Sequence, residues 1–223
     1  MIQKILLFIS FLFTGNLVYG QCASNATSTS DEEILNVTFG TLNNSSTCAS
    51  TGGAGSVLNE YSNYAYAGFA GGIPNIDRGC SIPFSIQIGT CGGNYANSVA
   101  IFIDWNNDLT FGAGEQVYTS VATTTGPHTE TGNISVPVTA TLGNCRMRVV
   151  NVEGIPSSIV ACGTYLWGET EDYFVNITNS GGVAPYVSSN VNQVVSGSVS
   201  QCAIYQQIIS IPIVMGAGCT AGT

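Results

Sequence analysis

The sequence predicts an all-β protein, an antiparallel β-sandwich of the jelly-roll or immunoglobulin-like kind that is stapled by disulfides. Helical periodicity is almost absent from the 223 residues. Short apolar runs alternate with clusters of Gly, Asn, Ser and Thr, which is the pattern of strands joined by turns. The chain also holds 8 cysteines, an even number, as expected of a disulfide-bonded exported protein.

The predicted strands are short and regularly spaced along the chain. They cover residues 34–39, 81–88, 98–104, 115–121, 132–136, 145–152 and 171–178. The segment from Met147 to Val152 is rich in β-branched residues, and the segment from Tyr173 to Ile177 alternates as a half-buried strand does. Two packed antiparallel sheets fit this spacing best.

The first twenty residues have the composition of a secretory signal peptide. Lys4 precedes an apolar run from Ile5 to Phe13, and Gly20 supplies a small residue before the expected cleavage. The run is too short for a membrane span. The mature chain is therefore predicted to be secreted or held at the cell surface, with no membrane insertion once the signal is removed.

The remaining chain divides into a long first domain, a linker and the start of a second domain. Residues 21–178 form the predicted sandwich, and residues 179–189 read as a linker rich in Gly and Ser. Residues 190–223 contain one strongly apolar strand, Gln206 to Val214, which cannot bury itself alone. They are therefore interpreted as the start of a truncated second β domain. The alternative is that residues 204–214 add a strand to the first domain.

The cysteines suggest particular pairings. No Cys-x-x-Cys pair occurs, which disfavours a structural zinc site. Two local pairs and one long-range staple between the start and the end of the first domain are plausible: Cys80–Cys91, Cys202–Cys219 and Cys22–Cys162.

The charge balance excludes some partners. Without residues 1–20 the chain has three Arg and no Lys against 13 Asp and Glu, a net charge of −10. Nucleic acid and anionic lipid both require basic patches, so neither is a predicted partner.

One acidic loop has the spacing of a calcium site. Side chains that carry oxygen occupy positions 1, 3, 5, 7 and 12 of this loop: Asp104, Asn106, Asp108, Thr110 and Glu115. Ca²⁺ takes six to eight oxygen ligands, and this is the ligand spacing of an EF-hand loop. Position 6 is Leu109 instead of the usual Gly, and no helices flank the loop, so we expect an EF-like loop between strands. The alternative is a solvated turn in which Asn and Asp cap their own backbone.

A second acidic cluster, Glu169, Glu171 and Asp172, opens the last predicted strand. Adjacent carboxylates repel one another unless a cation or an Arg lies between them. The cluster could pair with Arg146 and Arg148 in the preceding strand, or it could complete the metal site of the acidic loop. A pair of glycosidase acids is a third interpretation.

Catalytic residues are otherwise scarce. His128 is the single histidine, and no nucleophile elbow or His-Glu-x-x-His motif accompanies it. The fragment is therefore not expected to be an enzyme.

Four motifs, taken in order, carry a family resemblance. They are Cys22-Ala23-Ser24, Ile103 to Asp108 with Glu115-Gln116-Val117, Cys145 to Val149, and Gly168 to Tyr173. Over residues 21–178 the chain resembles the GEVED domain, named for a Gly-Glu-Val-Glu-Asp segment in which Thr170 here replaces Val. The tail from Tyr186 to Val214 resembles, more weakly, the N-terminal domain associated with BNR-repeat neuraminidases.

The resemblance implies a non-catalytic β-module of a large secreted or surface protein, as found beside hydrolase and adhesion modules in Bacteroidetes-type bacteria. Together with the acidic loop, it predicts a calcium-stabilised extracellular module for adhesion or substrate attachment, with a surface glycan or a protein as ligand. The alternative is an accessory domain of a secreted peptidase or glycosidase whose catalytic domain lies beyond Thr223.

Overall fold

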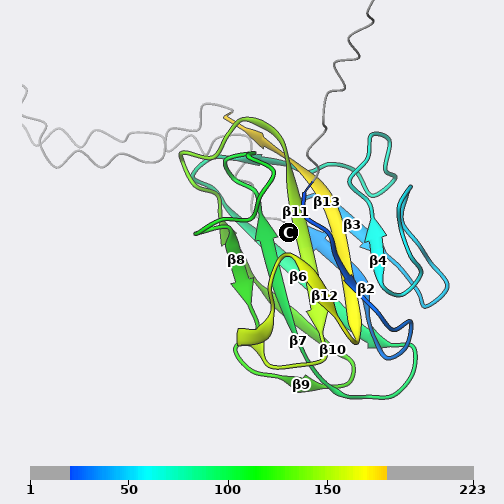
Figure 1. Ribbon diagram of the computed structural model, residues 1–223. Helices are drawn as coiled ribbons and strands as arrows, with labels where there is room; N and C mark the ends of the chain where they lie inside the picture. The colour runs from blue at the N-terminus through cyan, green and yellow to red at the C-terminus, as the bar shows by residue number, and fades with distance from the viewer. Residues whose placement is uncertain (1–20, 180–223) are drawn as a thin grey trace, which may run out of the picture.

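The computed structural model describes residues 21–179, which fold into an all-β sandwich (Figure 1). Within that range the one helical element is a 3-10 turn, η1 (Pro156–Ser158), and no helix is long and apolar enough to cross a membrane. The predicted signal peptide, the linker, the second domain and the Cys202–Cys219 pair lie outside the described residues.

The smaller sheet has four antiparallel strands. Their order is β10 (His128–Ser135), β6 (Ser81–Thr90), β2 (Glu32–Phe39) and β3 (Leu42–Ser45). Alternate residues of β6, from Ile82 to Ile88, are buried. This sheet therefore has one apolar face, as the period of two in the sequence requires.

The larger sheet is built around three long antiparallel strands. Its order is β4 (Tyr61–Asn63), β13 (Gly168–Thr178), β11 (Gly143–Val152), β7 (Ala96–Ile103) and β8 (Gln116–Thr119), with β5 (Asn75–Asp77) also paired to β13 and β9 (Thr124–Thr125) to β7. The seven predicted strands correspond to the long strands and β8.

Three short pairings depart from the antiparallel rule. Strands β4 and β5 each run parallel to β13, and β1 (Ser24–Ala26) runs parallel to β12 (Gly163–Tyr165). Each of these four strands has three residues, and β4, β5 and β12 each follow a long connection rather than a hairpin turn. The antiparallel sandwich is confirmed, and these strands are additions at its margins.

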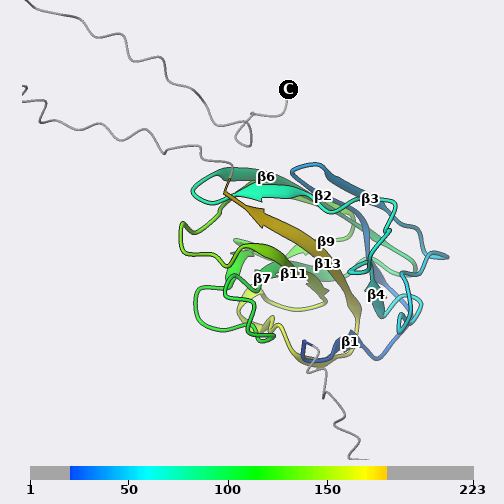
Figure 2. The same cartoon turned by 90° about the horizontal axis from the view of Figure 1, so that it is seen from above.

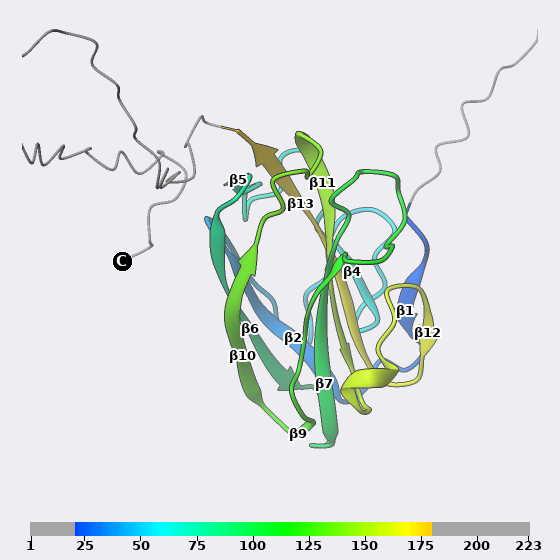
Figure 3. The same ribbon diagram turned by 90° about the vertical axis from the view of Figure 1, so that its left-hand side faces the viewer.

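The main core fills the space between the two sheets, which Figures 2 and 3 show as separate layers. Val37 and Ile86 come from the small sheet, and Val149 and Tyr173 come from the large one. A second apolar cluster lies on the outer face of the large sheet, where Phe102 and Val150 pack with Ile159 and with Phe111 of the acidic loop. The large sheet is therefore covered on both faces.

Two disulfides staple the sandwich. Cys22 bonds Cys162 with a Cα–Cα distance of 5.5 Å, which confirms the predicted long-range staple. The predicted Cys80–Cys91 pair is wrong, because Cys91 bonds Cys48. Cys80 and Cys91 flank β6, and a strand of 10 residues holds its ends about 30 Å apart, far beyond the ~7 Å limit for a disulfide. Cys80 is itself disulfide-bonded.

Removal of either disulfide is expected to destabilise the chain strongly. The bonds close loops with sequence separations of 140 and 43 residues. Loop entropy then predicts losses of about 5 kcal/mol for Cys22→Ser with Cys162→Ser and about 4 kcal/mol for Cys48→Ser with Cys91→Ser. Urea denaturation of the full chain measures both, and losses below about 1 kcal/mol would contradict the loop-entropy argument.

Candidate functional site

The acidic loop, residues 104–115, connects the antiparallel neighbours β7 and β8 at the edge of the large sheet. The Ile103 N–H donates to the carbonyl of Glu115 at 2.8 Å, and the Asp104 N–H donates to the carbonyl of Arg146 at 2.9 Å. These bonds extend the sheet to both ends of the loop. The first and last predicted ligands, Asp104 and Glu115, are therefore brought together by strand pairing.

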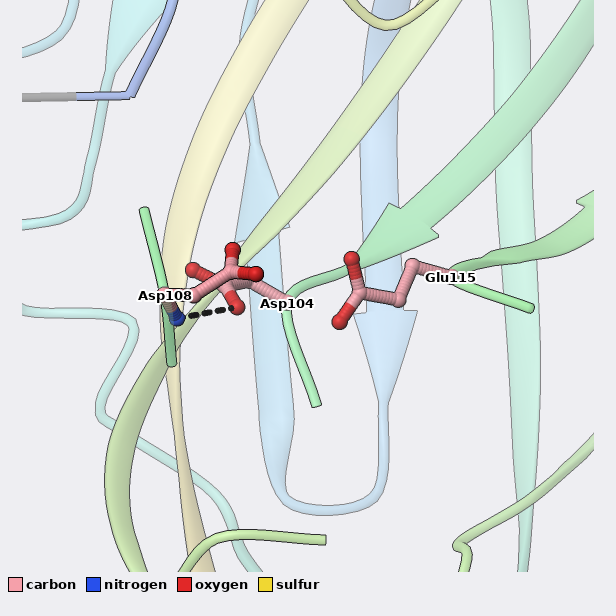
Figure 4. A group of neighbouring side chains, drawn as sticks. All are labelled: Asp104, Asp108 and Glu115. Atoms are coloured by element: carbon pink, nitrogen blue, oxygen red, sulfur yellow. Dashed lines mark hydrogen bonds between the residues drawn. The ribbon is translucent and has the colours of Figure 1, made fainter. Parts of the chain in front are cut away.

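Three carboxylates of the acidic loop converge. One oxygen from each of Asp104, Asp108 and Glu115 lies within 4.8 Å of the other two. Figure 4 shows Glu115 extending toward Asp104, with Asp108 beside it. Asp104 is 0% exposed and Glu115 is 4% exposed, whereas Asp108 is exposed. Two of the three carboxylates are thus buried, and the third, that of Asp108, is open to solvent.

The buried carboxylates have neutral partners. Asp104 accepts the N–H groups of Asp108 at 3.1 Å and Leu109 at 3.0 Å, and also the side-chain amide of Gln21. Glu115 accepts the Gly112 N–H at 2.6 Å. None of the ion pairs within residues 21–179 involves either carboxylate. Uncompensated buried charges are costly, so the electrostatics of the loop favour a bound cation.

Asn106 and Thr110, the two neutral residues of the predicted set, lie beside Asp108. The Thr110 hydroxyl donates to Asp108 at 2.7 Å, and the Asn106 amide donates to it at 2.8 Å. These bonds, led by that from the Thr110 hydroxyl, lower the pKa of Asp108. The loop therefore brings all five predicted residues together and keeps its exposed carboxylate charged.

At position 6 of the acidic loop, where an EF-hand loop has a glycine, Leu109 adopts a left-handed backbone conformation. Leu109 has φ +68°, and Asn107 two residues earlier has φ +56°. The left-handed region costs a residue with a Cβ atom about 1–2 kcal/mol. Leu109 is 40% exposed, so burial of its side chain recovers little of this cost.

The structure does not bring the second acidic cluster to the acidic loop. Alternation along β13 separates its members between two faces. Asp172 lies on the outer face, where the Arg148 guanidinium donates to it at 2.7 and 2.8 Å and Arg146 lies at 3.4 Å. The ion-pair interpretation is thus confirmed for Asp172. Glu169 and Glu171 share the inner face with Tyr173 of the main core.

The inner carboxyl groups form a buried cluster with Glu33, which sequence reasoning missed. Glu169 accepts from the Ser62 hydroxyl at 2.8 Å and is hydrogen-bonded to Glu33, and Glu171 accepts from the Tyr173 hydroxyl at 2.6 Å. Burial, followed by the contact with Glu169, raises the pKa of Glu33 to about 10. Burial also raises the pKa of Glu169, and raises that of Glu171 well above its usual range. Glu33 therefore holds a proton at neutral pH and can donate it to Glu169.

Comparison with known proteins agrees with this arrangement. The sequence model of the GEVED domain matches residues 98–176, which span both the acidic loop and the segment 168–172. The chain is therefore similar to the GEVED domain over these residues. None of the curated proteins matches the chain. Among solved structures, the chain is similar to the crystal structure of the CARDB domain of the PF1109 protein in complex with di-metal ions, from Pyrococcus furiosus. The identity is 11%, the TM-score is 0.32, and the match covers 48% of this chain and 82% of that one.

The other positions of the segment that names the GEVED domain are also explained by packing. Gly168 has φ +121°, and a Cβ atom there would lie 2.1 Å from the carbonyl oxygen of Asn151. The Thr170 hydroxyl, on the outer face, lies 2.9 Å from that of Ser24 and 2.8 Å from that of Tyr165. Gly168 therefore permits the close approach of β11, and Thr170 joins β13 to the outer layer of β1 and β12.

Gln21 is a second residue, after Glu33, whose contact with a candidate site residue the sequence analysis missed. Its amide nitrogen donates to Asp104, while its amide oxygen is buried without a partner among the described residues. The two residues are 83 positions apart, so no local spacing could have indicated the contact.

The free energy of unfolding is expected to fall as the pH rises from about 4.5 to about 10. The folded state keeps protons on Glu33 and Glu171 that the unfolded chain releases near pH 4.5, so their contribution to stability is complete below that pH and is lost toward the raised pKa values. Glu33→Gln should flatten this dependence. Urea denaturation at pH 5, 7 and 9, in excess chelator, measures it.

Glu60→Gln, which removes a carboxyl group outside the cluster, is the matched control. If Glu33→Gln leaves the slope of stability against pH equal to that of the control, the cluster is not the origin of the dependence.

Proposed function

We propose that this chain is a non-catalytic, calcium-stabilised extracellular β-sandwich module, which serves adhesion or substrate attachment in a larger secreted or surface protein. The observation that carries the proposal is the acidic loop. It buries Asp104 and Glu115 beside Asp108, with no cationic side chain in ion-pairing range among residues 21–179. A bound cation offsets that charge.

The donor set supports calcium over softer metals. All groups that converge in the acidic loop are oxygen donors, and none is a histidine or a thiol. Carboxylate, amide and carbonyl oxygens in an irregular loop suit Ca²⁺, which accepts six to eight ligands in flexible geometry. Asn106 and the carbonyl of Thr110 are the further ligands that the spacing predicts, and water completes such shells.

The extracellular location is supported by covalent chemistry. Two disulfides lie within the described residues, and such bonds persist in oxidising compartments. A signal peptide at residues 1–20 would deliver the chain there. A covalently stapled module stabilised by calcium suits a medium in which calcium is abundant and reductants are scarce.

Calcium is expected to raise the melting temperature of the full chain. A ligand at about 100 times its dissociation constant stabilises the native state by about 2.7 kcal/mol, which corresponds to an upward shift of several degrees. The measurement is a thermal melt in millimolar Ca²⁺ and then in excess chelator. Asp108→Ala, at an exposed position, should abolish most of the shift without harming the fold.

Glu60→Gln is again the control and should keep the full shift. An equal melting temperature in calcium and in chelator would reduce the acidic loop to a self-capped turn.

Leu109→Gly is expected to stabilise the chain by about 0.5–1 kcal/mol, because relief of the left-handed strain exceeds the entropy cost of a glycine. Leu142→Gly is the matched control. Leu142 is also exposed but is not among the residues with positive φ, so the same change should destabilise by about 0.5–1 kcal/mol. Urea denaturation in chelator measures both, and equal signs would refute the assignment of strain.

A further inference from the structure

A cavity of about 400 Å³ opens beside β1 and β4, on the outer face of β11 and β13. That volume is in the range of small-molecule sites. Its wall includes Gln21, Asn25, Tyr61, Asn63, Arg146 and Asp172. It is separate from the carboxylates of the acidic loop, to which Gln21 alone of these residues is hydrogen-bonded.

The cavity carries one uncompensated positive charge. Arg148 donates to both oxygens of Asp172, and the Tyr61 hydroxyl adds a third bond to that carboxylate at 2.9 Å. Arg148 and Asp172 thus form a neutral pair. Arg146 has no other ion pair among residues 21–179 than a contact with that same carboxylate at 3.4 Å. In a chain of net charge −9, this site is positive.

Arg146, in the wall of the cavity, packs its guanidinium on an aromatic ring. Its guanidinium lies 5.2 Å from the centre of the Phe174 ring, and its side chain is 20% exposed. Its Nε is buried without a hydrogen-bond partner in the described part of the chain. Buried donors are almost always satisfied, so the Nε of this arginine in the cavity wall still lacks an acceptor within residues 21–179. A planar guanidinium matches a carboxylate.

A second buried atom without a partner in the described chain is an acceptor, whereas the Nε of Arg146 is a donor. The amide oxygen of Gln21 is buried and lacks a donor within residues 21–179. It requires a hydroxyl or an N–H. The rest of the wall combines the amides of Asn25 and Asn63 and the hydroxyl of Tyr61 with apolar groups. A ligand that brings both a carboxylate and several hydroxyls satisfies this set.

We propose that the cavity binds an acidic sugar, whose carboxylate pairs with Arg146 and one of whose hydroxyls donates to Gln21. The inference rests on the attachment function proposed above, because it names the ligand and the place of attachment. It does not depend on calcium as the stabilising ion.

Calorimetric titration of the full chain with D-glucuronate tests the proposal, with D-glucose and N-acetylglycylglycine as the comparison ligands. Glucuronate should bind with a dissociation constant in the millimolar range and at least tenfold more tightly than either, a difference of about 1.4 kcal/mol. Glucose lacks the carboxylate, and the peptide lacks the sugar hydroxyls. Equal binding of glucose, or of the peptide, overturns the acidic-sugar assignment.

Arg146→Gln should weaken glucuronate binding at least tenfold, whereas Arg78→Gln, away from the cavity, should leave it unchanged. Val57→Glu gives a second test that spares the buried network. Val57 lines the cavity and is 48% exposed, so a glutamate there should repel glucuronate and not glucose. Val121→Glu, at a 99% exposed position elsewhere, is its control.

Unchanged glucuronate binding in both Arg146→Gln and Val57→Glu refutes the site. Melting the same samples in calcium and in chelator keeps the two proposals distinct. A chain that calcium stabilises but that ignores glucuronate disproves the cavity alone, and a chain that binds glucuronate without a calcium shift disproves the metal site alone.

Discussion

The buried guanidinium of Arg148 holds together the parts of this domain that are far apart in the sequence. Arg148 is 2% exposed and donates twice to Asp172 on the neighbouring strand. It also donates to the carbonyls of Cys22 at 2.8 Å and Ala161 at 2.6 Å, and it lies 5.2 Å from the ring of Phe111. One charge therefore joins the GEVED segment (residues 168–172), the residue Cys22 before β1, the loop that leads to Cys162 and the acidic loop. The desolvation of the pair is tolerable because its donors have partners.

The side chains of the GEVED segment lie on both faces of β13, because successive residues of a strand point to opposite faces. Its aspartate, Asp172, faces outward to Arg148, and its two glutamates, Glu169 and Glu171, face inward to Glu33. The same short run of acids thus contributes one carboxylate paired with arginine and two carboxyl groups whose pKa values are raised by burial. Environment rather than residue type separates the two faces: arginine side chains contact the outer carboxylate, while burial without a cation raises the pKa of the inner ones. Asp172 alone of the three reaches the cavity wall, so the segment's outward face is the one that bears on ligand binding.

The sequence predicted the long strands and the composition of the acidic loop, because both depend on local spacing. A period of two marks β6 and β13, β-branched residues mark β11, and ligand spacing marks Asp104 to Glu115. The three-residue strands had no such pattern, since their pairing is set by long connections. The contacts of Glu33 with Glu169 and of Gln21 with Asp104 span more than 80 positions and leave no local trace. The Cys80–Cys91 error has the same origin, because closeness in sequence was taken for closeness across a strand that in fact holds the two residues apart.

The acidic loop and the cavity meet at Gln21, and this contact connects cation and ligand. The amide of Gln21 donates to Asp104 and the same residue lines the cavity, so the orientation of one side chain affects both places. A cation that engages Asp104 competes with the Gln21 amide for the same carboxylate and so changes the cavity wall. Linkage is reciprocal, so a ligand that fixes Gln21 must alter cation affinity by the same factor by which the cation alters ligand affinity. A second route between the two places runs through Arg148, which lines the cavity and lies 5.2 Å from the ring of Phe111 in the acidic loop.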